Sequence, residues 1–273
     1  MKIDINTEFI VQHLASLKDC VIDASKEIMD VYSSDDFGEI NKSDGSPLTL
    51  ADERANQIII DRLKSISPSI PIISEETFNK ESLLNLENVY WLVDPLDGTK
   101  EFVNKTDEFT VNIALIESKK SVFGIVGAPV KNKIWHGSIF YKSNPISKNS
   151  NELRIVMSKS HKSDNDKAFL EFLDGQSIKY KIIEKGSSLK LCSLADGDAD
   201  IYPRFGPTSE WDIAAAHAVL ASFGGSVISV EDETELSYAK TNSILNPYFI
   251  AFRNNAIKDE FLPVLRDFFQ KLV

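Results

Sequence analysis

Apolar positions recur every three or four residues in two N-terminal stretches, and this spacing predicts two amphipathic helices. The apolar stripe of the first stretch consists of Leu14, Leu17, Val21, Ala24, Ile28 and Val31. The stripe of the second stretch consists of Ala51, Ala55, Ile58, Ile59, Leu63 and Ile66. A polar segment at 33–47, rich in turn residues, separates them. Each predicted helix therefore buries one side only.

Strand-like apolar runs follow the second helix. They lie at 71–74, 89–93, 109–117, 122–130 and 133–141. Lys119 and Lys120 stand between two of these runs, which favours an antiparallel hairpin. The first half of the chain is therefore predicted to be two helices on an antiparallel sheet.

The pattern changes after about residue 153, where short strands and helices alternate. Strands are predicted at 153–158, 178–184, 199–205, 226–230 and 248–252, and helices at 164–174, 188–197, 211–223 and 258–272. Such alternation is typical of an α/β layer. We therefore expect an α+β half, 1–153, and an α/β half, 154–273. No flexible linker separates them, so they should pack as one rigid body.

Composition and charge exclude several classes of function. The chain has 273 residues, 42% of them hydrophobic, and a net charge of −11. Binding to nucleic acid or to an acidic membrane needs a basic surface, which this charge disfavours. The N-terminus lacks the pattern of a signal peptide, and no apolar run approaches the roughly 18 residues of a membrane span. Cys20 and Cys192 are isolated. We expect a soluble, cytoplasmic protein, and peripheral membrane association stays open.

Five acidic residues stand at the ends of predicted elements rather than on exposed helix faces. They are Asp52, Glu75, Asp94, Asp97 and Asp212. Two of them lie in the stretch VDPLDGT (93–99), where like charges raise one another's pKa unless a cation lies between them. Carboxylate oxygens without His or Cys indicate a hard cation, Mg²⁺ or Mn²⁺. Two such ions about 3.5–4 Å apart can clamp a phosphate.

The same loop offers a phosphate contact and a water contact. Gly98 lets the backbone approach a ligand closely, and free N–H groups at a helix start bind phosphate oxygens. The Thr99 hydroxyl could hold a water whose proton Asp52 accepts. Taken singly, each acid also has a simpler interpretation: Asp97 and Asp212 as helix N-caps, Asp52 and Glu75 as solvated surface groups.

These motifs, in this order, resemble the inositol monophosphatase superfamily of metal-dependent, lithium-sensitive phosphatases. The matching stretches are 42–52, 74–76, 93–99 and 210–225, which span nearly the whole chain. The resemblance implies a layered αβαβα sandwich of the sugar-phosphatase type. It implies two or three Mg²⁺ ions, with Mn²⁺ as an alternative, the third lying near Asp52. The implied metal ligands are Glu75, Asp94, the Leu96 carbonyl, Asp97 and Asp212, and the implied catalytic residues are Asp52, Thr99 and Glu75.

Within that superfamily, residues 186–212 resemble the bacterial 3'(2'),5'-bisphosphate nucleotidases of the CysQ type. These enzymes remove the 3'-phosphate of adenosine 3',5'-bisphosphate (PAP) and leave AMP. The sulfated relative of PAP, PAPS, is a second candidate substrate. The implied substrate-binding residues are Glu75, Leu96, Asp97, Gly98, Thr99, Ser158, His161, Gly186, Lys190 and Asp212. Glu210 departs from the familiar pattern, and we expect it to alter the rim of the pocket.

Other interpretations stay open at this point. A haloacid-dehalogenase phosphatase would need an aspartate where Pro95 stands, so that class is excluded. The substrate could instead be an inositol monophosphate or a fructose bisphosphate, or the chain could be an inactive binding homologue. Without the resemblance, His161 reads as a surface residue and Lys190 as an exposed helix lysine. His13, His136 and His217 are predicted to be structural, Phe268 and Phe269 to lie in the core, and the chain to be a monomer or weak dimer.

Overall fold

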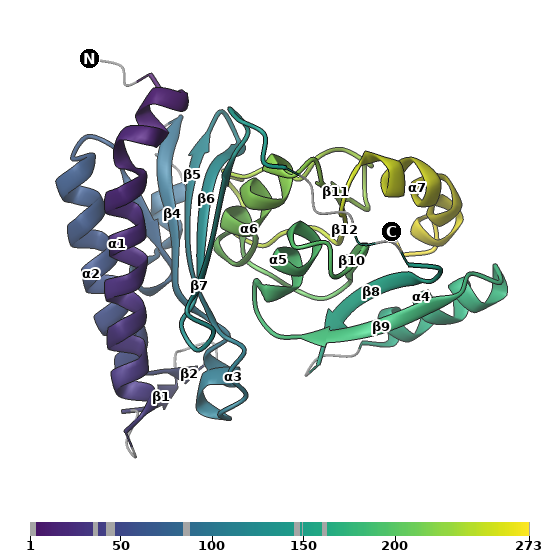
Figure 1. Ribbon diagram of the computed structural model, residues 1–273, viewed down its shortest axis with the longest axis horizontal. Coiled ribbons are helices and arrows are strands. Elements are labelled where there is room, and N and C mark those ends of the chain that lie inside the picture. The colour runs from purple at the N-terminus through teal and green to yellow at the C-terminus, as the bar shows by residue number, and fades with distance from the viewer. Residues whose placement is uncertain are drawn as a thin grey trace.

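The computed structural model describes residues 4–34, 38–41, 47–83, 88–144, 148, 150–159 and 163–272. In this part of the chain, two five-stranded sheets alternate with three layers of helices (Figure 1). The order of the layers is helix, sheet, helix, sheet, helix. The predicted αβαβα sandwich is therefore confirmed.

The first sheet has the strand order β3-β4-β5-β6-β7. Its strands are β3 (Ile72–Ser74), β4 (Val89–Asp97), β5 (Thr110–Glu117), β6 (Lys120–Ala128) and β7 (Lys133–Ser138). Neighbouring strands are antiparallel except for β3 and β4, which run parallel. The prediction of a fully antiparallel sheet is wrong for that pair, because the segment after β3, described at 75–83, crosses over before the chain re-enters the sheet.

Two long helices, α1 (Thr7–Tyr32) and α2 (Leu50–Ile66), cover the outer face of this sheet (Figure 1). Their stripes face Trp91, Ile113, Phe123 and other strand residues in one core. Both helices begin at side-chain caps. The Asn6 side chain accepts a hydrogen bond from the Phe9 amide at 3.0 Å, and Thr49 forms a capping box with Asp52.

The second sheet has the strand order β11-β12-β10-β8-β9. Its strands are β8 (Leu153–Ser158), β9 (Tyr180–Lys185), β10 (Ile201–Arg204), β11 (Ser226–Ser229) and β12 (Phe249–Phe252). The three strands β10, β8 and β9 run parallel, which is usual in an α/β layer, whereas β12 runs antiparallel to both β10 and β11. Helices α4 (Asp164–Gly175) and α7 (Asn255–Phe269) belong to the outer core of this sheet, and Phe268 and Phe269 are buried there as predicted.

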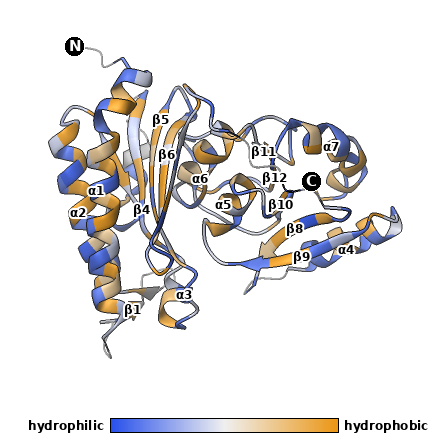
Figure 2. Cartoon of the chain, viewed as in Figure 1, coloured by the Kyte–Doolittle hydropathy of each residue, from blue (hydrophilic) through white to orange (hydrophobic). Residues whose placement is uncertain are grey.

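The middle layer consists of α5 (Leu189–Ala195) and α6 (Glu210–Ser222), which are buried on almost every side. Figure 2 shows the difference: α1 and α2 have a polar and an apolar side, whereas α5 and α6 are mostly apolar. The first sheet approaches α6 closely, since a Cβ on Gly124 would lie 2.0 Å from the Ala215 carbonyl oxygen. Because α6 packs on a sheet from the first half, the two halves share one core. The boundary at residue 153 stays a prediction.

Smaller elements join these layers. They are β1 (Ile40–Asn41), β2 (Pro47–Leu48), α3 (Thr99–Val103) and two 3₁₀ turns, η1 (Glu75–Thr77) and η2 (Lys80–Leu83). Residues 42–46 of the first family motif lie outside the described residues. No described helix is long and apolar enough to cross a membrane. Cys20 and Cys192 are both buried and free.

Candidate active site

A bulge in β4 places two aspartates at the end of the strand. Asp94 pairs with Asn112, but the next registered pair is Asp97 with Thr110, so β4 contains one extra residue. Proline is tolerated at such bulges, which accounts for Pro95 inside the strand. Strand β4 therefore continues to Asp97, whereas the sequence predicted a strand that ends at residue 93 and a loop after it.

Three other acids reach the same region from separate elements. Glu75 begins η1 directly after β3, and β3 runs parallel to β4, so both strands end at one edge. Asp52 and Asp212 lie in the first turns of α2 and α6. The exposed fraction of both Asp52 and Asp94 is 1%. This burial excludes the interpretation of Asp52 as a solvated surface group.

Like charges in this buried region act on one another. The pKa of Asp94 is raised well above its usual range by burial and by the charges of Glu75 and Asp97. Burial, Asp97 and Glu75 also raise the pKa of Asp212. Two carboxylates with raised pKa values at one place need protons or a cation to offset their repulsion.

Asp97 does not act as the N-cap of α3, because that position belongs to Gly98. Its Oδ2 accepts hydrogen bonds from the Ser188 amide at 2.6 Å and from Asn112 Nδ2 at 3.3 Å. Burial raises its pKa, although Lys190 and the Ser188 hydrogen bonds act in the opposite direction. Asp97 thus ties the end of β4 to the start of α5.

Asp212 combines a capping contact with its place in the acidic group. The N-cap of α6 is Ser209, and Asp212 completes the capping box by accepting from the Ser209 amide at 2.9 Å. Asp97 is therefore not a helix N-cap. Asp212 is not the N-cap residue either, but it takes part in the capping box of α6.

The donor chemistry of this group fits a hard divalent cation. All the available donors are carboxylate or carbonyl oxygens, and three of the acids, Asp94, Asp97 and Asp212, have raised pKa values that a nearby cation would lower. Among the described residues, no three Asp, Glu, His or Cys side chains are arranged so that they could hold one ion as they stand. Asp97 and Asp212 are instead bonded to backbone amides.

Asp52 and Thr99 form the pair that the sequence predicted. The Thr99 hydroxyl lies 3.2 Å from Asp52 Oδ1 and 3.2 Å from the Leu96 carbonyl oxygen. Asp52 Oδ2 accepts from the amide and the hydroxyl of Thr49, both at 2.7 Å. The capping box thus fixes the Asp52 carboxylate so that its other oxygen faces Thr99.

A cavity of about 160 Å³ lies beside the acids, between the two sheets. Asp97, Gly98 and Asp212 line one part of it, and Ser158 and Lys190 line another. The structure therefore brings together these predicted residues from β4, α6, β8 and α5.

Lys190 is buried, with 7% of its surface exposed, which excludes its interpretation as an exposed helix lysine. Burial lowers its pKa to about 8, while Asp97 acts in the opposite direction. Its ammonium group lies 5.7 Å from the centre of the Tyr202 ring. A cation in this position is available to an anionic ligand.

Arg204 is a second cation in the cavity, and it is not among the site residues predicted from the sequence. Its Nη2 donates to the Pro207 carbonyl at 2.9 Å, but its buried Nε has no partner among the described residues. A signal was present in the sequence: Arg204 is the penultimate residue of the strand predicted at 199–205, and the ends of parallel strands meet at one edge. Ser158 ends the neighbouring strand β8 at that edge.

Three other predicted residues have different outcomes. A Cβ on Gly186 would lie 2.8 Å from the Glu108 carbonyl oxygen, and its amide donates to Glu108 Oε2 at 3.0 Å. Gly186 therefore permits close packing between the two sheets. Glu210 does not line the cavity: it forms an ion pair with Lys240 and accepts from the Ala239 amide at 2.9 Å. His161 lies outside the described residues.

The predicted structural histidines also have identifiable contacts. His217 forms hydrogen bonds with Tyr238 at 2.7 Å and with the carboxylate of Glu235 at 2.8 Å, and neither partner was predicted from the sequence. His136 lies 3.3 Å from the Tyr141 hydroxyl.

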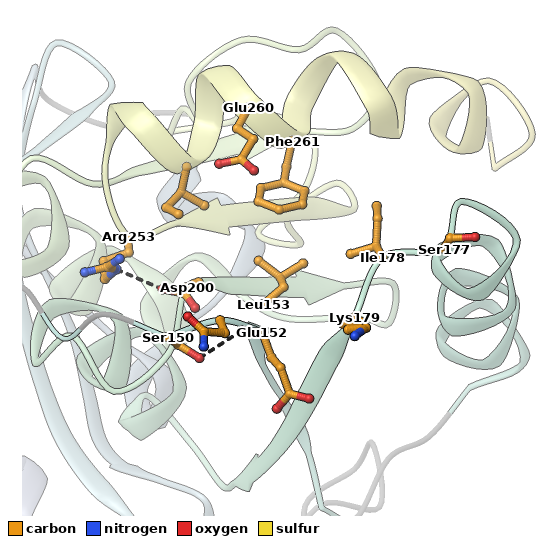
Figure 3. A pocket seen from close by; sticks show the side chains of 12 residues that line it. Ser150, Glu152, Leu153, Ser177, Ile178, Lys179, Asp200, Arg253, Glu260 and Phe261 are labelled. Atoms are coloured by element: carbon orange, nitrogen blue, oxygen red, sulfur yellow. Dashed lines mark hydrogen bonds and ion pairs between the residues drawn. The ribbon is translucent and has the colours of Figure 1, made fainter.

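Figure 3 shows a larger cavity, of about 610 Å³, between α7 and the start of β8. Its lining includes Leu153, Phe261 and Asp200, but none of the five acids described above. Asp200 forms ion pairs with Arg154 at 2.7 Å and Arg253 at 3.0 Å. A carboxylate already balanced in this way supplies no reactive group, so the chemistry belongs to the smaller cavity.

Comparison with known proteins agrees with this geometry. The sequence profile of the inositol monophosphatase family matches residues 11–266. The chain belongs to the inositol monophosphatase family. Membership implies a metal-dependent phosphatase, which the oxygen donors of the site fit.

Individual relatives show which members of the inositol monophosphatase family this chain is similar to. The 3'(2'),5'-bisphosphate nucleotidase CysQ of Escherichia coli K12 is 39% identical over 235 residues, which cover 83% of this chain and 94% of that protein. The CysQ of Buchnera aphidicola is 44% identical over 211 residues, covering 73% and 78%. The crystal structure of CysQ from Bacteroides thetaiotaomicron superposes with a TM-score of 0.78 at 32% identity, covering 88% of this chain and 97% of that one.

Proposed function

We infer that this chain is a 3'(2'),5'-bisphosphate nucleotidase that removes the 3'-phosphate of PAP and leaves AMP. The observation that carries this inference is the composition of the 160 Å³ cavity, whose lining combines the acids Asp97 and Asp212 with the cations Lys190 and Arg204. Such a cavity suits a substrate with two phosphates, one cleaved at the acids and one held by the cations. The relatives described above are named for this activity.

We propose Mg²⁺ as the metal, two or three ions in number, with Mn²⁺ as an alternative. The residues that would hold it are Glu75, Asp94, Asp97, Asp212 and the carbonyl of Leu96. When bound, such ions offset the phosphate charge and lower the pKa of water. The buried, mutually repelling carboxylates support this assignment.

Asp52 and Thr99 supply the proton acceptor for the attacking water. The water donates a proton to the Thr99 hydroxyl, which passes its own proton to Asp52 Oδ1 along the 3.2 Å contact. A bond forms between the water oxygen and phosphorus, and the bond from phosphorus to the 3'-oxygen breaks. The 3'-oxygen takes a proton from a solvent water, and Asp52 then releases the proton that it accepted to solvent, so the protons balance. Inorganic phosphate and AMP result.

Lys190 and Arg204 are placed to bind the 5'-phosphate. The protein has a net charge of −11, so an anionic substrate needs local donors. The unpartnered Nε of Arg204 and the buried ammonium of Lys190 supply them. We retain Ser158, Gly186 and His161 as nucleotide contacts, together with Gly98 and Thr99 at the scissile phosphate.

We also propose that the chain acts as a monomer or weak dimer in the cytoplasm, on a small nucleotide rather than on nucleic acid. Two free, buried thiols are typical of a reducing compartment.

Phosphate release from PAP, PAPS, inositol 1-phosphate and fructose 1,6-bisphosphate under identical Mg²⁺ tests the proposed function. We expect the highest kcat/KM for PAP or PAPS, no activity in metal-free protein, and recovery on adding Mg²⁺. A preference for inositol 1-phosphate or fructose 1,6-bisphosphate would replace the substrate, and inactivity on all four would favour a binding homologue.

A further inference from the structure

A second cavity, distinct from the substrate pocket and of about 540 Å³, lies where four layers of the sandwich meet. Its lining comes from the β5–β6 turn (Lys119 and Lys120), from α6 (His217), from the start of β11 (Ser226) and from the first turn of α7 (Lys258). Its volume falls in the range of about 300–1,000 Å³ that is typical of small-molecule sites.

This cavity lies at the end of the first sheet opposite the active site. In the β4–β5 pair, Asp97 is opposite Thr110 at one end and Val89 is opposite Glu117 at the other. The β5–β6 turn follows Glu117, so it is separated from the acids by the length of β5, about 25 Å for eight residues. The second cavity is therefore not an extension of the substrate pocket.

Positive charge dominates the second cavity, although the protein as a whole is acidic. None of its three lysines forms an ion pair with a carboxylate in the part of the chain that the structure describes. Its one acid, Glu235, is already engaged: Oε1 accepts from His217 Nε2 and from the Val227 amide, both at 2.8 Å. Three lysines therefore face a single carboxylate that is already bonded.

Two further features favour an anionic ligand. Ser226, a residue only 4% exposed, lines the cavity, and its buried hydroxyl has no hydrogen-bond partner among the described residues. Buried polar groups normally have a partner, so this hydroxyl is free for a ligand. Asn255 and Lys258 bring the N-terminal end of the 15-residue helix α7 to the same space, where its dipole favours an anion.

We propose that this cavity is a second binding site, for a small organic phosphate. The lysines and the Ser226 hydroxyl bind the phosphate group, and the apolar wall formed by Ile139, Ala221 and Leu236 contacts the organic body. The ligand would touch α6, the helix whose first turn carries Asp212. The proposal does not depend on the substrate of the active site.

Amide chemical-shift mapping on the full-length, metal-free protein tests this site, with phenylphosphonate as the ligand. Phenylphosphonate carries an anionic group on an apolar ring and has no phosphate ester to hydrolyse. We expect saturable shifts at Ser226 and Asn255. Shifts at Gly98 and Thr99 report binding at the active site in the same titration, so the two sites are separated.

The controls are matched by charge. Lys258→Gln should weaken the Ser226 response about tenfold or more, and Lys120→Gln with Lys258→Gln should abolish saturation there. Lys64→Gln, an exposed lysine on α2, should change neither response. The proposal is overturned if only Gly98 and Thr99 respond, if the Ser226 shifts do not saturate, or if the double variant keeps the affinity of the unmodified protein.

Discussion

Asp94 is 1% exposed, and the charges of four other acids raise its pKa. Without a cation, its ionised form is disfavoured because burial and repulsion act in the same direction. A bound cation reverses both effects. The Asp94 carboxylate should therefore lower the stability of the metal-free protein, whereas the activity of the metal-bound protein should require it.

We predict that Asp94→Asn raises the melting temperature of the metal-free protein and removes most of the stabilisation that Mg²⁺ gives the unmodified chain. Thermal unfolding with and without Mg²⁺ measures both effects. Turnover should fall by about 10²–10³ or more. Asp30→Asn, on the exposed side of α1, is the matched control. Turnover within threefold of the unmodified protein would contradict the metal assignment.

Thr99→Ala should lower turnover by about 10²–10⁴ with little change in KM, because its hydroxyl bonds to Asp52 and is proposed to accept the proton of the attacking water. Steady-state kinetics on PAP measures the two constants. Thr99→Ser retains the hydroxyl and should restore most of the rate. A large rise in KM at constant turnover would make Thr99 a substrate-binding residue.

Lys190→Met should raise the KM for PAP by about 10- to 150-fold, the equivalent of one hydrogen bond to a charged group. Adenosine 3'-monophosphate lacks the 5'-phosphate, so its KM should scarcely change. Lys64→Met is the matched control. Equal losses on both substrates would mean that Lys190 supports the helix instead.

The lowered pKa of Lys190 predicts a pH dependence as well. Its ammonium loses its proton as the pH rises through about 8, so the KM for PAP should rise between pH 7 and pH 9. Lys190→Met should remove this rise. A KM that rises equally in both proteins would assign the effect to another group.

At the residue scale, the five acids and Thr99 could be predicted because their positions at element ends and their order along the chain are visible in the sequence. Although Arg204 lies near the end of a predicted strand, the sequence alone could not distinguish it from a surface arginine, since the burial of its Nε depends on the packing of β10 against β8. The Glu210 side chain contacts a loop 29 residues further along the chain. The sequence alone therefore could not predict that this side chain lies outside the cavity.

At the scale of elements, the site depends on how β4 ends. The bulge between Asp94 and Asp97 is followed by Gly98, whose φ of 92° lies in the left-handed region. That conformation turns the chain from the strand into α3 and brings the Thr99 hydroxyl to Asp52. A Cβ at Gly98 would also lie 3.1 Å from the Glu108 carbonyl oxygen.

Gly98→Ala should therefore destabilise the protein by about 1–2 kcal/mol and lower turnover, because a left-handed conformation costs about that much for any residue with a Cβ. Gly175→Ala, at the end of α4, has no atom within 4 Å of the added Cβ and should change stability by less than about 1 kcal/mol. Urea unfolding of the two variants measures the difference. Equal stabilities would show that the turn after β4 is not constrained.

The helices and most strands could be predicted from periodicity, since each buries one face or lies in a continuous apolar run. The parallel pairing of β3 with β4 could not be predicted, because the described part of the crossover, 75–83, contains two short 3₁₀ turns instead of a long apolar helix. The extension of β4 to Asp97 was missed because Pro95 and Gly98 read as loop residues.

At the scale of the whole molecule, the active site exists only because both halves share the middle layer. Asp94 and Asp97 come from the first half, and Lys190, Arg204 and Asp212 come from the second. The order of the layers followed from the resemblance and from the alternating pattern. The sizes of the cavities could not be predicted from the sequence, because they depend on how closely the layers approach one another.

The central claim is that the enzyme selects a nucleotide with two phosphates and cleaves the 3'-group. Phosphorus NMR of an equimolar mixture of PAP and inositol 1-phosphate, with the enzyme and Mg²⁺, tests it most directly. We predict that the 3'-phosphate signal of PAP decays first, while its 5'-signal persists as AMP and inorganic phosphate accumulates. Earlier loss of the inositol 1-phosphate signal, or loss of the 5'-signal of PAP, would contradict the claim.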